Sequence, residues 1–298
     1  MPFIFDKEKL ETILKSFASS GKIFTNESQF QFELSRAIDD EIIKYKRDNN
    51  VSQDSIYPCV KLEVLSMGRD EIKEKREKLY TDIVICLGEN EKNEKECVAI
   101  ELKYKMINKN LEYSVNDHKV KTFSQGAYDI GSIQFLEDVE RLEKLTLNPP
   151  KIQLNFDENN KIIKSFAVII SNDKSYWIEK KDNKSIYNEF CLDQGEKKNG
   201  KLRLNTYIGK NGKKLGKITK DIKEKNERVR LETIDDYERY GVDIKRKAFV
   251  DLCGEYKCNW KPYDVQYTSC KELSKEFLNT GKACDYKFQY LIFEIGDK

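Results

Sequence analysis

Thr81-Asp82-Ile83-Val84-Ile85 and Val98-Ala99-Ile100-Glu101-Leu102-Lys103 are the two stretches that decide the fold. Both predict short apolar strands, yet each carries ionisable side chains where a buried sheet tolerates few. Because side chains alternate between the faces of a strand, Glu101 and Lys103 share one face and Leu102 takes the other. Burying an ion costs on the order of several kcal/mol unless a partner or a metal compensates. The pattern therefore predicts a functional site on this strand pair.

The connection between the two strands, residues 88–96, is polar and predicts an antiparallel hairpin. With the turn in the middle of this loop, the register places Asp82 opposite Glu101. Cross-strand neighbours on one face lie about 5 Å apart, so the two carboxylates repel each other unless a cation lies between them. Oxygen ligands without cysteine or histidine favour Mg²⁺ or Mn²⁺ over zinc. Lys103, on the same face, would then reach a water on the metal or a phosphate.

The Asp-x18-Glu-x-Lys arrangement of Asp82, Glu101 and Lys103 resembles the motif of the PD-(D/E)XK nuclease superfamily, which has the restriction-endonuclease-like fold. Thr81 stands where the superfamily usually has proline. The resemblance, which is to one bacterial branch of these nucleases, extends over most of the chain, but only the core motifs are specific. It implies an α/β (α+β) fold with an α-β-β-β-α-β core, a mixed central sheet and a β-rich C-terminal addition.

The first helix of this core is expected over residues 26–38, with Thr25 or Asn26 as the N-cap. Glu27 projects into the same sector as the apolar face of this helix. The resemblance implies that Glu27 is a third metal-binding carboxylate. The alternative is that Glu27 only favours the positive N-terminus of the helix. The apolar face consists of Phe30, Leu34, Ala37 and Ile38.

The other core elements are expected at residues 57–65 for the first strand, 119–145 for a long helix and 165–171 for the last strand. The last of these is an unbroken apolar run, typical of a central strand. The resemblance implies that Gln125, on the long helix, helps to orient the catalytic lysine or the substrate phosphate. Tyr128 is expected to serve packing instead.

Two regions are expected: residues 1–177 as the nuclease core and residues 178–298 as the β-rich extension, packed on the core and involved in substrate choice. Residues 207–218 predict a basic hairpin with a tight Asn-Gly turn, which would lie along a phosphate backbone. The alternative for this hairpin is a solvated loop of a lysine-rich protein. The lysines expected to bind nucleic acid are Lys210, Lys213, Lys214 and Lys217.

The composition favours a large folded protein with a net charge of only +2, in which 39% of the 298 residues are hydrophobic. No apolar run approaches the roughly 20 residues needed to span a bilayer, and the N-terminus does not resemble a signal peptide. The eight cysteines are scattered, without a CxxC pair, and are expected to be reduced. Together these features favour the cytoplasm.

The resemblance implies a Mg²⁺-dependent (or Mn²⁺-dependent) phosphodiesterase, a deoxyribonuclease that cuts DNA internally, with a role in restriction or phage defence by analogy. Asp82, Glu101, Glu27 and the carbonyl of Leu102 would bind the metal, and Lys103 would orient or deprotonate the attacking water. Cutting both strands commonly uses two active sites, which is compatible with a homodimer. The alternatives are a nuclease acting on RNA, single strands or DNA ends, and a non-catalytic nucleic-acid-binding subunit of the same fold.

Overall fold

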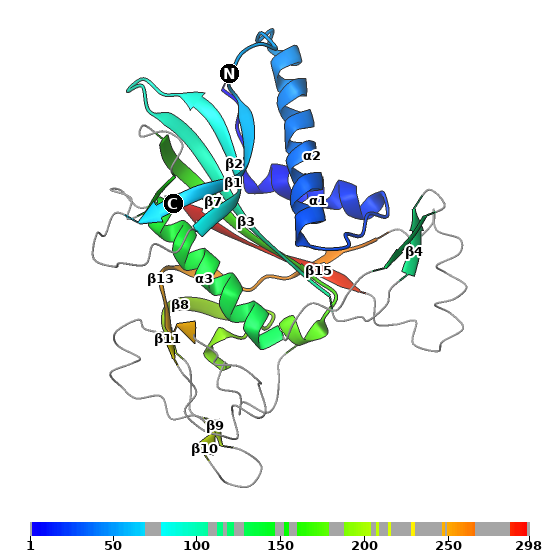
Figure 1. Ribbon diagram of the computed structural model, residues 1–298, viewed down its shortest axis with the longest axis vertical. Helices are drawn as coiled ribbons and strands as arrows, with labels where there is room; N and C mark the ends of the chain where they lie inside the picture. Colours follow the sequence, from blue (N-terminus) through cyan, green and yellow to red (C-terminus); the bar gives the residue numbers. More distant parts are fainter. Residues whose placement is uncertain are drawn as a thin grey trace. The chain divides into compact units, whose positions relative to one another are not determined.

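A computed structural model describes a mixed α/β protein (Figure 1). Contacts between residues divide the chain into two compact units. Unit 1 comprises Met1–Gly126, Arg141–Asp173 and Trp260–Lys298, and unit 2 comprises Ala127–Glu140 and Lys174–Asn259. The residues described are 2–68, 79–106, 112–115, 118–121, 128–146, 152–154, 160–178, 188–203, 207–208, 214–215, 228–229, 246–247, 249–265 and 287–296.

Two helices of unit 1 begin with the side-chain caps that their sequences favour. Asp6 caps α1, Lys7–Ser19, by accepting a hydrogen bond from the Lys9 N–H at 2.9 Å. Asn26 caps α2, Glu27–Asp48, in the same way, with the Gln29 N–H at 2.8 Å. Helix α2 thus confirms the helix expected over residues 26–38 but extends ten residues further, and α1 was not anticipated.

A mixed seven-stranded sheet forms the centre of unit 1, in the order β14-β15-β7-β3-β2-β1-β6. All neighbours are antiparallel except β3 and β7, which run parallel and are connected through the segment that contains α3, Tyr128–Thr146. The expected mixed central sheet is therefore confirmed. The strands are β1 Cys59–Gly68, β2 Leu79–Glu89, β3 Lys95–Lys105, β6 Ile152–Leu154, β7 Asn160–Ser171, β14 Lys261–Tyr263 and β15 Phe288–Gly296.

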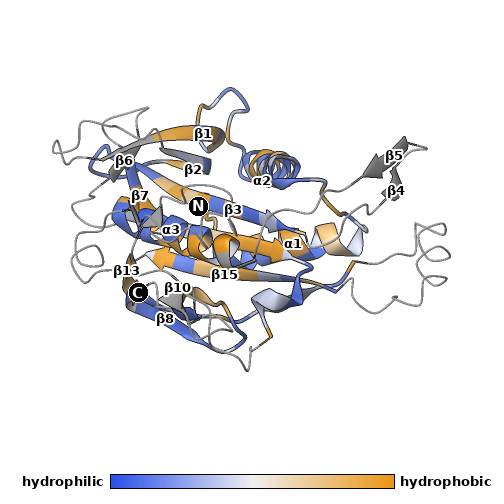
Figure 2. Ribbon diagram, turned by 60° about the horizontal axis from the view of Figure 1, so that its bottom comes forward, coloured by the Kyte–Doolittle hydropathy of each residue, from blue (hydrophilic) through white to orange (hydrophobic). Residues whose placement is uncertain are grey.

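Alternate positions of the central strands build the hydrophobic core. Ile83 of β2 lies opposite Ile100 of β3, and both are fully buried against α1 and α2. Tyr104 of β3 continues this face and packs edge-on against Phe24, with ring centroids 5.5 Å apart. Hydrophobic residues accordingly gather along the central strands (Figure 2). The same alternation turns Asp82, Glu101 and Lys103 away from this core.

Three cysteines lie side by side across the first three strands, since Cys86 of β2 is paired in register with Cys59 of β1 and with Cys97 of β3. All six cysteines in the described part of the chain are thiols rather than disulfides, as expected. A hydrogen bond with Cys86, together with burial, raises the pKa of Cys59. The Cys59 thiol lowers the pKa of Cys86, but the Cys97 thiol and burial outweigh it and raise that pKa to about 12.

Unit 2 contains an antiparallel pair, β8 Lys197–Arg203 with β13 Phe249–Lys257, which shifts register between Leu252 and Tyr256. Two short 3-10 helices, Lys174–Tyr176 and Asn188–Phe190, precede it. The expected basic hairpin is present as β9 Tyr207–Ile208 paired with β10 Lys214–Leu215. Unit 2 also contains the short antiparallel pair of β11 Arg228–Val229 with β12 Arg246–Lys247, whereas the pair of β4 Glu112–Val115 with β5 His118–Lys121 belongs to unit 1.

One expectation differs from this architecture. The start of the helix expected over residues 119–145 is wrong, because residues 118–121 form β5, where Lys121 and Val120 pair with Glu112 and Tyr113; the helix itself is described as α3, Tyr128–Thr146. The boundary expected at residue 177 stays a prediction; β15 pairs with β7 from Gln289 to Gly296, and both strands belong to unit 1. No helix in the described ranges has the length and apolarity to cross a membrane.

Candidate functional site

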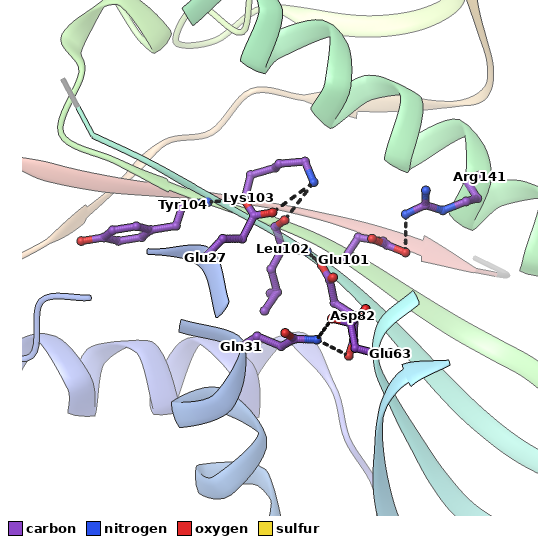
Figure 3. Close-up of polar contacts among 9 residues, drawn as sticks. All are labelled: Glu27, Gln31, Glu63, Asp82, Glu101, Leu102, Lys103, Tyr104 and Arg141. Carbon is purple, nitrogen blue, oxygen red and sulfur yellow. Dashed lines mark hydrogen bonds and ion pairs between the residues drawn. The ribbon is translucent and has the colours of Figure 1, made fainter. Parts of the chain in front are cut away.

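Five of the predicted site residues lie where β2, β3 and the start of α2 meet: Glu27, Asp82, Glu101, Leu102 and Lys103 (Figure 3). The register that sets Ile83 opposite Ile100 brings Asp82 to the level of Glu101 at its next step. Oδ2 of Asp82 accepts a hydrogen bond of 2.7 Å from the backbone N–H of Leu102. The Asp82 carboxylate thereby links β2 to β3 just beyond Ile83 and Ile100, the pair at this end of their register.

Glu101 is the most deeply buried acid of the site, with only 3% of its surface exposed. Its Oε1 lies 2.5 Å from Nη2 of Arg141 in α3, which makes the two side chains a close ion pair. The Arg141 side chain is itself 15% exposed. Because a buried carboxylate without a counter-charge is strongly unfavourable, this pairing stabilises the ionised form of Glu101 in its place.

Lys103 and Glu27 form a second ion pair on the other side of Leu102 (Figure 3). Nζ of Lys103 lies 3.6 Å from Oε1 of Glu27 and donates a hydrogen bond of 3.2 Å to the carbonyl oxygen of Leu102. Oε2 of Glu27 accepts a hydrogen bond of 3.1 Å from the backbone N–H of Tyr104. Glu27 therefore faces Lys103, and as the first residue of α2 it also lies at the positive end of that helix. Its expected role as a third metal-binding carboxylate stays a prediction.

Gln31 and Glu63 also belong to this constellation, and the sequence analysis did not identify them. Nε2 of Gln31 donates to Oε1 of Glu63 at 2.7 Å and to the backbone carbonyl of Asp82 at 2.8 Å. Gln31 lies one helical turn after Glu27, so the i, i+4 spacing in the sequence was a usable signal. Glu63 adopts a left-handed conformation with φ of +50° in the middle of β1, a position that propensity does not indicate.

Arg141 is the third residue that sequence reasoning missed. It follows Leu136 and Val139 on a helix whose apolar residues are buried, and nothing in this pattern distinguishes it from an arginine at the edge of the packed face. Its partner Glu101 is 40 positions earlier in the chain and lies on a different element. The pair depends on the crossover from β3 to α3, which the sequence indicates only in outline.

The donor atoms of the site fit a hard divalent cation, because they are carboxylate and carbonyl oxygens. Within the ranges that the structure describes, no three or more acidic, histidine or cysteine side chains are arranged to hold an ion jointly. The described contacts give the reason: Glu101 points to Arg141, and Glu27 points to Lys103. A cation would have to draw these carboxylates away from their basic partners.

The remaining predicted site residues cannot be placed in the constellation. Gln125, Lys210, Lys213 and Lys217 lie outside the described residues. Lys214 is described only as part of β10, opposite Ile208. The roles assigned to these five residues stay predictions.

Comparison of the chain with protein-family models, with curated proteins and with solved structures finds no match.

Proposed function

We propose that the protein is a metal-dependent nuclease with a restriction-endonuclease-like core, which hydrolyses phosphodiester bonds in DNA. The observation that carries this proposal is the meeting of Asp82, Glu101 and Lys103 around Leu102 on two adjacent strands. The succession of α2, β1, β2, β3, α3 and β7 supports it, with the short strands β4 and β5 before α3 and β6 after α3. Within this succession β1 to β3 are antiparallel and β7 runs parallel to β3, which is compatible with the α-β-β-β-α-β core of the PD-(D/E)XK superfamily.

Asp82, Glu101 and the carbonyl oxygen of Leu102 are the proposed ligands of Mg²⁺ or Mn²⁺, with Glu27 as the further carboxylate. When bound, such an ion supplies positive charge at the scissile phosphate and makes water there more acidic. The hydrogen bond from the Leu102 N–H holds Asp82 in orientation, so that one carboxylate oxygen is fixed by the backbone of β3. Gln31 fixes the same segment of β2 by donating to the Asp82 carbonyl.

Lys103 is the proposed residue that orients or deprotonates the attacking water. Its ammonium is held by Oε1 of Glu27 and by the carbonyl of Leu102, so the side chain is positioned before any substrate enters. An ammonium beside the scissile phosphate also opposes the negative charge that develops during phosphoryl transfer. Lys103 remains 16% exposed and is therefore accessible from solvent.

A specific observation favours a second candidate, a non-catalytic nucleic-acid-binding subunit of the same fold. Glu101 and Glu27 both have basic partners in the protein, as structural carboxylates do. Under this alternative, the ion pairs stabilise the fold and the basic hairpin of β9 and β10 contacts the phosphates. A different nuclease substrate, such as RNA or single strands, is compatible with the same active site. The same proposal includes DNA as the partner, a homodimeric assembly, a cytoplasmic location and a role in defence.

The deciding experiment is cleavage of supercoiled plasmid by the purified protein in Mg²⁺ or Mn²⁺. We expect nicked or linear product with the native protein and none with Glu101→Ala, Asp82→Asn or with EDTA. Glu89→Gln, an exposed acid near the end of β2, is the matched control and should cleave normally. Discrete product bands would indicate sequence specificity. If RNA or single-stranded DNA is cut instead, the substrate assignment is wrong; if no nucleic acid is cut, the non-catalytic subunit is favoured.

A further inference from the structure

Glu101 presents an unusual combination of burial and charge for a proposed metal ligand. Only 3% of its surface is exposed, and Oε1 is 2.5 Å from the guanidinium of Arg141. A guanidinium stays protonated throughout the physiological pH range, so this counter-charge is permanent. Arg141 therefore contacts one carboxylate oxygen of a residue that is itself a proposed metal ligand.

Lys103, the other basic residue of the site, is paired with a different carboxylate. The ammonium of Lys103 is directed to Oε1 of Glu27 and to the Leu102 carbonyl. Figure 3 shows the two basic groups on separate carboxylates, Arg141 at Glu101 and Lys103 at Glu27. The site thus contains two ion pairs. The pair with Glu27 holds Lys103, the proposed catalytic lysine, in place, and the pair with Arg141 neutralises Glu101, a proposed metal ligand.

We propose that Arg141 is a positioning residue that competes with the divalent cation for Glu101 and so sets the cation concentration at which the site fills. Each partner satisfies the need of the buried carboxylate for positive charge, and one can replace the other without leaving Glu101 uncompensated. The displaced guanidinium adds a repulsive charge close to the incoming ion, which weakens cation binding further. This inference rests on the proposed function, because it takes Glu101 to be a ligand.

The test measures Mn²⁺ binding directly, by titration calorimetry or by the loss of the free Mn²⁺ EPR signal, without using cleavage. Arg141→Met removes the charge and keeps much of the volume of the side chain. We expect it to bind Mn²⁺ about tenfold more tightly than the native protein, as the loss of one competing ion pair allows. Arg141→Lys keeps a charge and should stay near the native affinity. Lys144→Met, on the same helix α3, changes the net charge equally and should leave the affinity unchanged.

Thermal unfolding provides an independent readout. In EDTA, Arg141→Met should unfold at a lower temperature than the native protein, because the buried Glu101 has lost the charge of Arg141. Mn²⁺ should raise the melting temperature of this variant more than that of the native protein, because the ion replaces the missing charge. If Arg141→Met is folded only when Mn²⁺ is present, the competition is equally supported.

If a folded Arg141→Met variant binds Mn²⁺ no more tightly than the native protein, Arg141 does not compete with the cation for Glu101, and the proposal is wrong. Should Arg141→Met be unfolded with and without Mn²⁺, the proposal fails as well, because the cation then does not replace the guanidinium. These outcomes are distinct from a failure of the proposed function. A native protein that binds Mn²⁺ and cuts DNA, with no gain of affinity in Arg141→Met, contradicts only the role of Arg141. A native protein that neither binds Mn²⁺ nor cuts any nucleic acid contradicts both.

Discussion

The carboxylate of Asp82 accepts a hydrogen bond from the backbone N–H of Leu102 at 2.7 Å. The contact ties the aspartate of β2 to the residue between Glu101 and Lys103, so the spacing of the Glu-x-Lys triplet is fixed relative to Asp82. Because the acceptor is an ion and the donor a backbone amide, the bond is of the stronger, charge-assisted kind. The geometry of the proposed site is thus built into the pairing of two strands rather than into mobile loops.

Replacement of Asp82 by asparagine separates its chemical role from its structural one. The amide oxygen of Asp82→Asn can still accept from the Leu102 N–H, so we expect the free energy of unfolding to fall by only about 1 kcal/mol. Metal-dependent cleavage should fall by at least about a hundredfold, because a neutral amide binds Mg²⁺ poorly. Plasmid cleavage and urea unfolding measure the two effects.

The control for this variant is Asp82→Ala, which loses the hydrogen bond as well as the charge. It should be less stable than Asp82→Asn and equally inactive. Loss of cleavage in Asp82→Asn through global unfolding would instead assign Asp82 a structural role.

Replacement of Lys103 by alanine tests the proposed catalytic lysine. Lys103→Ala should retain its fold and its affinity for DNA while cleavage drops by about a hundredfold or more, the usual effect of removing a positioned proton-transfer group. Single-turnover cleavage at saturating protein measures the chemical step apart from binding. Lys105→Ala removes a lysine two residues further along the same strand and is the matched control. Normal cleavage by Lys103→Ala would refute the assignment.

Replacement of Glu27 by glutamine distinguishes the two roles that remain open for this residue. Glu27→Gln keeps an oxygen for the Tyr104 N–H but loses the ion pair with Lys103. A metal-binding role predicts that the Mg²⁺ concentration for half-maximal cleavage rises about tenfold, with little change in melting temperature. A role confined to the helix N-terminus predicts the reverse: a lower melting temperature and an unchanged Mg²⁺ requirement.

The core strands were predictable because their signals are local. The alternation in β2 and β3 and the polar loop between them were sufficient to place Asp82 level with Glu101. Helix α2 was predictable from its apolar spacing and its Asn26 cap, and its length was underestimated because Ile42 lies beyond a run of three acidic residues, 39–41.

The features that were missed depend on contacts between distant residues. Strand β15 has a clear strand pattern, but no local signal assigns it to the edge of β7, more than a hundred residues earlier. Arg141 and Glu63 became recognisable only when the side-chain contacts were visible, because polar residues on amphipathic elements usually face solvent. The helix expected from residue 119 failed for another reason: the alternating His118–Lys121 segment suits a strand equally well.

Alkaline pH should destabilise the protein through its buried thiols. The pKa of Cys86 is raised to about 12, whereas the unfolded thiol has an ordinary value near 9.0. Between these values the unfolded chain releases a proton that the folded protein keeps, so unfolding becomes more favourable as the pH rises. The stabilisation is fully present below about pH 9 and is lost towards pH 12, at up to about 1.4 kcal/mol per pH unit for one thiol. Burial raises the pKa of Cys258 to about 12 as well, which adds to the slope.

Urea unfolding under reducing conditions at pH 7, 9 and 10.5 measures this slope. Cys86→Ala should be less stable at pH 7, because it leaves a small cavity, but its stability should decline less steeply with pH than that of the native protein. Cys253→Ala, which replaces an exposed cysteine of β13, is the control and should keep the native slope. Parallel pH profiles for the native protein and Cys86→Ala would show that the Cys86 thiol ionises equally readily in the folded and unfolded chains, and that the paired thiols of β1, β2 and β3 do not hold its proton.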